Sequence, residues 1–322
     1  MKYFSTNNKN LSVSFKEAVI KGLAPDGGLF YPEHLPLLDK SFIDNLHNLS
    51  LAEIGFEVAS HFLGDDIPSG KLKEICEDAL NFPTPLVSFE PNVYSLELFH
   101  GPSCAFKDVG ARFMSRCLSY FAQESDEKIT ILVATSGDTG SAVANGFLGI
   151  ENIEVIILYP SGKVSQIQEQ QLTTLGKNIT ALEIDGSFDD CQALVKQAFQ
   201  DKDLNKKMKL SSANSINIAR LIPQSFYYFY AYGQLKHQNK DLVVSVPSGN
   251  YGNLTAGLMA KQMGLPIKKF IASTNINKVV PDYLDTGKYV SKASIRTISN
   301  AMDVGAPSNF DRMMTLYQEN HP

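Results

Sequence analysis

One pattern, which occurs twice, constrains the fold more than any other: an apolar β-branched run, a glycine-rich turn and then a run of small residues. The first copy leads from Ile129–Ala134 into residues 135–141, and the second from Leu242–Val246 into residues 248–253. Such runs predict buried strands, and the small-residue segments after them predict the first turns of helices. When a helix follows a strand through a glycine turn, the backbone N–H groups and the dipole at the helix N-terminus can bind an anion. The pattern therefore predicts an α/β fold with anion-binding loops beyond the carboxyl ends of parallel strands.

The segments between these two loops also alternate between strand and helix patterns. Residues 155–159 and 180–184 are predicted strands, and residues 166–175 a predicted helix. This alternation predicts a mostly parallel sheet covered by helices. The organisation we predict is a helix-rich N-terminal region at 1–92, a lysine-bearing segment with a small α/β domain at 93–235, and the start of a large α/β domain at 236–322.

Lys107 occupies an unusual setting, the segment HGPSCAFKDVG at 100–110. A free lysine is protonated near neutral pH and is a poor nucleophile. It performs covalent chemistry when it is desolvated or held as a Schiff base by an aldehyde. Taken alone, a lysine beside Asp108 indicates a solvated surface pair. Together with two anion-binding loops, it indicates a site for an aldehyde cofactor.

Composition excludes some classes of function. The 322 residues carry a net charge of −5 without a long basic run, which argues against nucleic acid as a partner. No run is long enough for a membrane span and the start lacks an apolar signal core, so we predict a cytoplasmic protein. The four cysteines lie far apart without histidine companions, and we predict that all are reduced and buried, with no metal or disulfide role: Cys76, Cys104, Cys117 and Cys191.

Together these motifs resemble the fold type II family of pyridoxal-phosphate enzymes and, within it, the threonine synthase branch. The resemblance runs along essentially the whole chain, through GLAPDGGLFYP at 22–32, LELFHGP at 96–102 and SSANSIN at 211–217. It implies two domains of mostly parallel, helix-covered sheets, with pyridoxal 5′-phosphate bound by the large domain. The implied reaction converts O-phospho-L-homoserine and water to L-threonine and phosphate by γ-elimination and β-addition, the last step of threonine biosynthesis.

The resemblance also implies roles for individual residues. Lys107 holds the cofactor as a Schiff base and becomes a general base when the substrate amine displaces it. The residues implied to bind the cofactor phosphate are Ser248, Gly249, Asn250, Gly252 and Asn253. The loop that faces the substrate carboxylate and the cofactor ring consists of Ser136, Gly137, Asp138, Thr139 and Gly140. The residues implied to bind the substrate phosphate are Asn214, Ser215 and Arg220. Asn217 belongs to the same sequence pattern, and Lys163 and Ser165 are weaker candidates.

Several positions leave two interpretations open. Asp138 either shares a proton with the cofactor or turns away to cap the helix. Arg112 either binds substrate or braces the wall of the site, and His100 either orients the lysine loop or satisfies a hydrogen bond in the core. The aromatic run Phe226–Tyr230 covers all sides of a helix, which predicts core packing.

Two other functions remain possible from the sequence. One is a related phospho-lyase or dehydratase that releases a keto acid, although its relatives carry Ser-Phe-Lys where this chain has Ala105-Phe106-Lys107. The other is a non-catalytic protein that binds the cofactor. Family members continue beyond Pro322, so we expect this chain to lack a C-terminal part that holds the hydroxyl partner of the pyridine nitrogen.

Overall fold

The computed structural model describes residues 1–123 and 128–319. Its helices are α1 Phe15–Lys21, α2 Lys40–Asn45, α3 Leu51–Leu63, α4 Ser69–Ala79, α5 Lys107–Gln123, α6 Asp138–Phe147, α7 Gln166–Thr173, α8 Phe188–Gln200, α9 Lys202–Lys207, α10 Ile218–Leu221, α11 Phe226–Leu235, α12 Gly252–Gln262, α13 Val279–Thr286 and α14 Phe310–Glu319. Its strands are β1 Tyr3–Ser5, β2 Asn8–Val13, β3 Phe30–Pro32, β4 Leu86–Glu90, β5 Val93–Leu96, β6 Ile129–Ala134, β7 Ile153–Pro160, β8 Ile179–Ile184, β9 Lys209–Ser212, β10 Leu242–Pro247 and β11 Ile267–Ser273.

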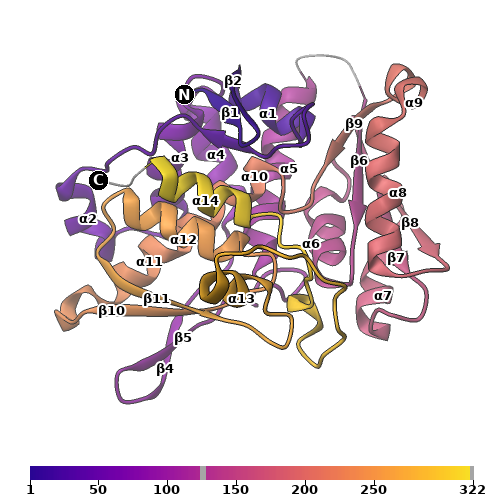
Figure 1. Cartoon of the computed structure of the whole chain (residues 1–322). Helices are drawn as coiled ribbons and strands as arrows, with labels where there is room; N and C mark the ends of the chain where they lie inside the picture. Colours follow the sequence, from indigo (N-terminus) through magenta and orange to yellow (C-terminus); the bar gives the residue numbers. More distant parts are fainter. Residues whose placement is uncertain (124–127, 320–322) are drawn as a thin grey trace.

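A parallel sheet with strand order β8-β7-β6-β9 forms one side of the molecule (Figure 1). The chain moves outward from β6 to β8 and then returns to β9. Because such crossovers are right-handed, this reversal places α8 on the face opposite α6. The strand side chains agree: Val133 and Ile157 join the main core, whereas Leu132 and Leu158 pack in a second cluster with α8. The expected mostly parallel, helix-covered α/β fold is confirmed.

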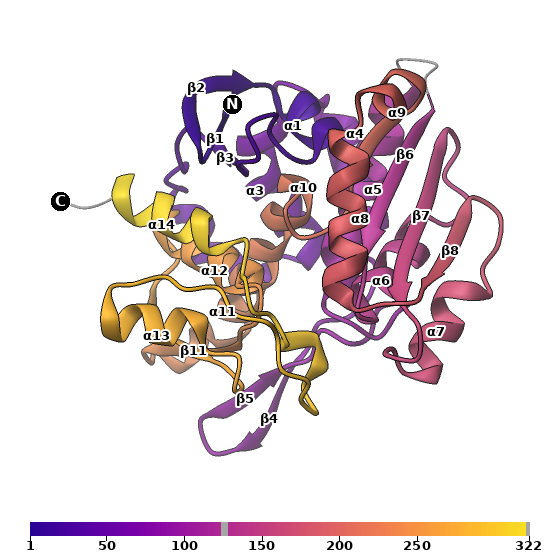
Figure 2. The same ribbon diagram turned by 45° about the vertical axis from the view of Figure 1, so that its right-hand side comes forward.

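A second parallel pair, β10 and β11, lies on the other side of the molecule beside α11 and α12 (Figure 1). Figure 2 shows β11, α11 and α12 apart from the strands β6, β7 and β8. Two antiparallel units were not expected from the sequence: the N-terminal sheet β2-β1-β3 and the hairpin β4-β5. The helical spacing of Phe15, Ala18, Val19 and Leu23 predicts a first helix that reaches Leu23, but α1 ends at Lys21. Gly22 adopts a φ of 69° and its N–H donates to the Ala18 carbonyl, so Leu23 lies beyond the helix. The domain boundaries at 92 and 235 stay a prediction.

The aromatic run in α11 packs in the core, as expected. Phe226 and Phe229 have no exposed surface, while Tyr227 and Tyr228 each donate a hydroxyl hydrogen bond to Asn253 Oδ1, at 2.7 and 2.6 Å. The core therefore holds one residue of the second glycine loop in place. This contact joins the packing of α11 to the candidate site.

The cysteine prediction is wrong at one position. Cys76, Cys117 and Cys191 are buried, but Cys104 is exposed in a turn with a φ of 57°. Within residues 1–123 and 128–319, no cluster of side chains suits a metal ion. The same residues include no helix that is long and apolar enough to cross a bilayer.

Candidate functional site

A cavity of about 580 Å³ lies between the two parallel sheets, where several strands end. Thr135 and Ser136 follow β6, Asn214 and Ser215 follow β9, and Gly249 follows β10; all five line this cavity. Strand ends converge there because parallel strands present their carboxyl ends at one edge of a sheet. The cavity thus brings both glycine loops, Lys107 and Arg220 together.

Lys107 is the first residue of α5 and lines this cavity. Its Nζ donates to Asp138 Oδ2 at 2.7 Å, and the two side chains are 17% and 20% exposed. Asp138 Oδ1 also accepts from the Thr139 N–H at 3.1 Å. Burial opposes the charge on Asp138, but Lys107 and these hydrogen bonds outweigh it and lower the pKa of Asp138 below its ordinary value. Asp138 is therefore an ionised partner of the lysine that also binds the first turn of α6.

Replacing Asp138 with asparagine should reduce stability in a pH-dependent way. Near neutral pH we expect a loss of about 2 kcal/mol, typical of a hydrogen bond between charged groups. Because the folded-state pKa of Asp138 is lowered, its contribution is present above the ordinary carboxyl value of 3.8 and disappears as the pH falls through the lower folded value. Denaturant unfolding of both proteins from pH 7 to pH 2 measures this difference. A difference in unfolding free energy between the two proteins that is the same at every pH would contradict the ion pair.

The first glycine loop is held by the side chain of Thr135. Its Oγ1 accepts from the N–H groups of Gly137 and Gly140, at 2.9 and 2.8 Å. Gly137 has a φ of 141°, and a Cβ there would lie 2.4 Å from the Gln168 side chain, so only glycine fits. Ser136 and Thr139 line the cavity, whereas Gly137 and Asp138 stand behind it.

The second glycine loop leads into α12, whose first residues Gly252 and Asn253 line the cavity. Asn250 donates to Ser215 Oγ at 2.5 Å, and its own Oδ1 accepts from the Ser308 N–H at 2.7 Å. Ser248 is buried just outside the lining and donates to the Val246 carbonyl. The N-terminus of α12 thus offers neutral donors and a helix dipole to an anion.

A side chain at position 249 should weaken cofactor binding. A Cβ on Gly249 would lie 2.7 Å from the Met302 Cα, so Gly249→Ala has to move the backbone of one of the two segments. We expect at least about tenfold weaker binding of pyridoxal phosphate, which corresponds to about 1.4 kcal/mol. A fluorescence titration measures it. Gly70→Ala in α4 is the matched control because nothing lies within 4 Å of its added Cβ; equal affinities of the two variants would contradict the steric argument.

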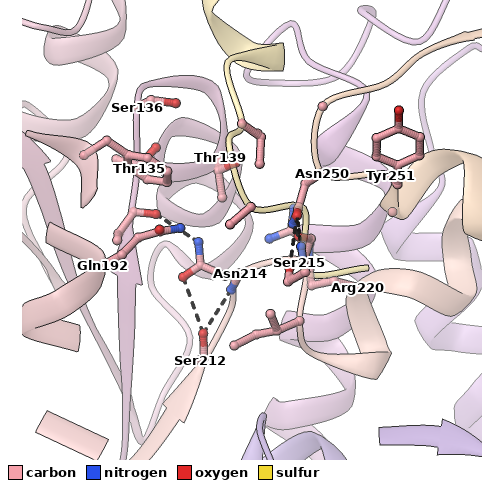
Figure 3. A pocket seen from close by; sticks show the side chains of 18 of the residues that line it. Thr135, Ser136, Thr139, Gln192, Ser212, Asn214, Ser215, Arg220, Asn250 and Tyr251 are labelled. Atoms are coloured by element: carbon pink, nitrogen blue, oxygen red, sulfur yellow. Dashed lines mark hydrogen bonds between the residues drawn. The ribbon is translucent and has the colours of Figure 1, made fainter. Parts of the chain in front are cut away.

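Arg220 lies in α10 at the floor of the cavity and is 3% exposed. It donates through Nη1 to the Ala213 carbonyl, whereas its buried Nε has no hydrogen-bond partner among the described residues. Burial lowers the pKa of Arg220 to about 10, so it stays a cation at neutral pH. Figure 3 shows Arg220, Ser215 and Asn250 gathered on one side of the pocket, while Asn214 lies beside Ser212 and its Nδ2 donates to the Ala134 carbonyl at 2.9 Å. A buried cation with an unsatisfied donor is suited to a bound anion.

Asn217 has a different task from its neighbours. Its Nδ2 donates to the carbonyls of Val19 and Ser212, each at 2.9 Å, and its Oδ1 accepts from the Ala219 N–H. All these partners are backbone groups, so Asn217 caps α10 and braces the loop that carries Asn214 and Ser215.

The remaining candidates lie outside the cavity lining. Lys163 donates to the Gly186 carbonyl at 2.7 Å, and Ser165 caps α7. Arg112 donates to the carbonyls of Asp78 and Ala79 at the end of α4, which agrees with a brace. His100 pairs with Glu97 at 2.7 Å and is one-third exposed, so neither interpretation offered for it describes this contact.

Several lining residues were missed by the sequence reasoning. One face of α8 supplies part of a wall through Phe188, Gln192, Lys196 and Phe199. Segment 301–306 and the N-terminal residues Leu23, Gly27 and Leu29 supply others. The helical spacing on α8 was visible in the sequence, but nothing local shows that this face points to the cavity.

The donor set fits the cofactor that the sequence resemblance implies. An amine for an aldehyde, a helix N-terminus with neutral donors for one phosphate, and a buried guanidinium for a second anion share one cavity. Nothing in this arrangement conflicts with a phosphorylated aldehyde and an anionic substrate bound together.

Comparisons with known proteins point the same way. A family model described as "Threonine synthase N terminus" matches residues 2–80, and one described as "Pyridoxal-phosphate dependent enzyme" matches residues 79–321. Threonine synthase of Escherichia coli (strain K12) is 50% identical over 319 residues, which are 99% of this chain and 74% of that protein.

Solved structures agree with the sequence comparisons. The crystal structure of the Escherichia coli threonine synthase superposes with a TM-score of 0.94 over 99% of this chain and 74% of that chain. A threonine synthase of Brucella melitensis with bound pyridoxal phosphate is 39% identical, with a TM-score of 0.93 over 99% of this chain and 70% of that one.

Proposed function

The chain belongs to the threonine synthase family of pyridoxal-phosphate enzymes, and from this premise we propose that it converts O-phospho-L-homoserine and water to L-threonine and inorganic phosphate. One observation carries the proposal: the Lys107–Asp138 pair and the buried guanidinium of Arg220 line or border the same cavity. The first suits proton transfer and the second suits a phosphate dianion.

The cofactor is assigned to Lys107 and to the second glycine loop. Lys107 Nζ is its covalent anchor, and the phosphate group falls to Ser248, Gly249, Asn250, Gly252 and Asn253. When bound, pyridoxal phosphate supplies an electron-withdrawing ring that stabilises negative charge on the substrate carbons. The chain supplies position and electrostatics, because neutral donors at α12 leave the arginine for the substrate.

Lys107 is assigned the proton transfers. Once its amine is free, Nζ takes a proton from the substrate α-carbon and returns protons in later steps. Asp138 accepts a hydrogen bond from that Nζ at 2.7 Å, and its lowered pKa makes it an ionised acceptor beside the amine. Asp138 thereby holds the ammonium group at a defined position between two transfers.

Arg220, Asn214 and Ser215 are assigned to the phosphate of the substrate. The fixed fork of a guanidinium matches phosphate oxygens, and its charge is complementary to the dianion that leaves. Ser136 and Thr139, with the Gly137 turn behind them, are assigned to the substrate carboxylate because they line the opposite wall at the start of α6. Lys163 remains the weakest candidate, since its amine already binds the Gly186 carbonyl.

The proposal is tested by product analysis of the protein loaded with pyridoxal phosphate. With O-phospho-L-homoserine we expect L-threonine and phosphate in equal amounts. Phosphate with a keto acid in place of threonine would identify a lyase that omits the water addition. A bound cofactor without phosphate release would contradict the proposed reaction.

A further inference from the structure

Ser215 has an unusual hydrogen-bond environment. Its Oγ accepts from two side-chain amides, Asn250 Nδ2 at 2.5 Å and Asn309 Nδ2 at 3.3 Å. An amide nitrogen can only donate, and a serine oxygen has two lone pairs. The two amides therefore occupy both lone pairs of Ser215 Oγ.

Neither amide can turn over, because an obligatory donor fixes the oxygen of each. Asn250 Oδ1 accepts from the Ser308 backbone N–H at 2.7 Å, and Asn309 Oδ1 accepts from Arg312 Nη1 at 2.8 Å. A backbone N–H and a guanidinium have no acceptor state. Flipping either amide would bring two donors face to face and leave a buried group unsatisfied.

Arg312 in α14 is itself held in one orientation. Its guanidinium is fully buried and donates to the carbonyls of Phe30, Ser215 and Ile216, with Nη2 at 2.9 Å from the first and 2.6 Å from the last. These acceptors come from β3 and from the loop after β9. Arg312 therefore fixes the orientation of the Asn309 amide and the position of the Ser215 carbonyl at the same time.

The remaining hydrogen-bonding atom of Ser215 is its hydroxyl proton. No acceptor within the described part of the chain receives it, and Ser215 lines the cavity together with Arg220 (Figure 3). Ser215 is already assigned to the phosphate of the substrate, and we propose that Asn309 and Arg312 are positioning residues that leave its hydroxyl able only to donate to a phosphate oxygen. This inference rests on the proposed function. It adds that the position accepts an unprotonated anionic oxygen and rejects a group that has to donate.

Reversing the polarity of one amide tests the proposal. In Asn309→Asp a carboxylate oxygen still accepts from Arg312, but the other oxygen takes the proton of Ser215. Inorganic phosphate is titrated calorimetrically into the cofactor-loaded protein, so no turnover is needed. We expect about tenfold weaker phosphate binding, as for loss of one hydrogen bond to a charged group. Ser215→Ala should cause a similar loss, and the double variant should bind no more weakly than Ser215→Ala.

The controls separate polarity from charge. Asn239→Asp adds the same charge at an exposed position outside the cavity and should leave phosphate affinity unchanged. If Asn309→Asp weakens phosphate binding equally with and without the Ser215 hydroxyl, the effect is electrostatic and the proposal is overturned. It is also overturned if only pyridoxal phosphate affinity falls, because the cofactor phosphate would then be the acceptor.

A second variant guards against misfolding, and the readout is independent of catalysis. If circular dichroism shows that Asn309→Asp is unfolded, Asn250→Asp applies the same reversal from the other amide, with its oxygen still facing the Ser308 N–H. Phosphate binding that depends on Ser215 and Asn309 in a protein that makes no threonine would support the inference and refute the proposed reaction. Threonine production together with unchanged phosphate binding in Ser215→Ala and Asn309→Asp would support the proposed reaction and refute the inference.

Discussion

Lys107→Ala is expected to abolish the visible absorbance of lysine-bound pyridoxal phosphate and to lower threonine formation by at least about 10³-fold, the loss typical of removing a general base. Lys107 lines the cavity and its amine contacts Asp138 at the edge of it, so this amine is the group placed to act. The fold should persist, because position 107 is the first residue of α5 and alanine favours helix. Absorbance spectra, product assays and thermal unfolding measure the three effects.

Lys206→Ala is the matched control for this substitution. Lys206 lies at the end of the short helix α9, is 75% exposed and pairs with Asp203. The same loss of one amine there should leave the spectrum and the rate unchanged. A Lys107→Ala protein that keeps the lysine-bound spectrum would refute the assignment of the anchor.

Arg220→Ala is expected to raise the KM for O-phospho-L-homoserine by about 100-fold or more, which is typical of truncating one partner of a buried charged pair. Among the residues that the structure describes, the guanidinium donates one hydrogen bond, to the Ala213 carbonyl, so its charge is not paired with a carboxylate there. Arg220→Lys should recover only part of the loss, because an ammonium group lacks the planar fork. Steady-state kinetics measure both variants.

The specificity of this effect is checked with a ligand that lacks phosphate. Affinity for L-homoserine should change little in Arg220→Ala, whereas an equal loss for both ligands would contradict a phosphate role. Arg296→Ala removes an exposed guanidinium outside the cavity and should not affect either ligand.

Much of the fold could be predicted from local patterns. The strand expected at 129–134 is β6 with the same bounds, and the helix expected at 166–175 is α7 from Gln166 to Thr173. The strand prediction succeeded because buried parallel strands are continuous apolar runs. The antiparallel units at β1–β3 and β4–β5 escaped notice, since short strands such as Tyr3–Ser5 have too few residues to show a period.

The segments that form the candidate site could be predicted from the sequence, but the contacts between their side chains could not. Lys107, the two glycine loops and Arg220 were singled out by residue type and spacing, and all contribute to one cavity. The sequence left the orientation of Asp138 open, because its choice between cofactor and helix cap depends on a lysine 31 positions earlier. Cys104 was misassigned because an exposed turn with positive φ has no signature at cysteine.

Local sequence patterns were sufficient to predict the alternation of strands and helices along the chain, the glycine turns, and the residue types that can bind an aldehyde and two anions. These features depend on residues that are close together in the sequence. The contacts between distant residues became visible in the folded chain: Lys107 with Asp138, α8 with the cavity, and Asn309 with Ser215, 94 positions apart. Pairing between distant segments is set by how whole elements pack and by the requirement that buried polar groups find partners. The polarity of Ser215 follows from that requirement, since Arg312 and the Ser308 N–H leave both amides a single orientation.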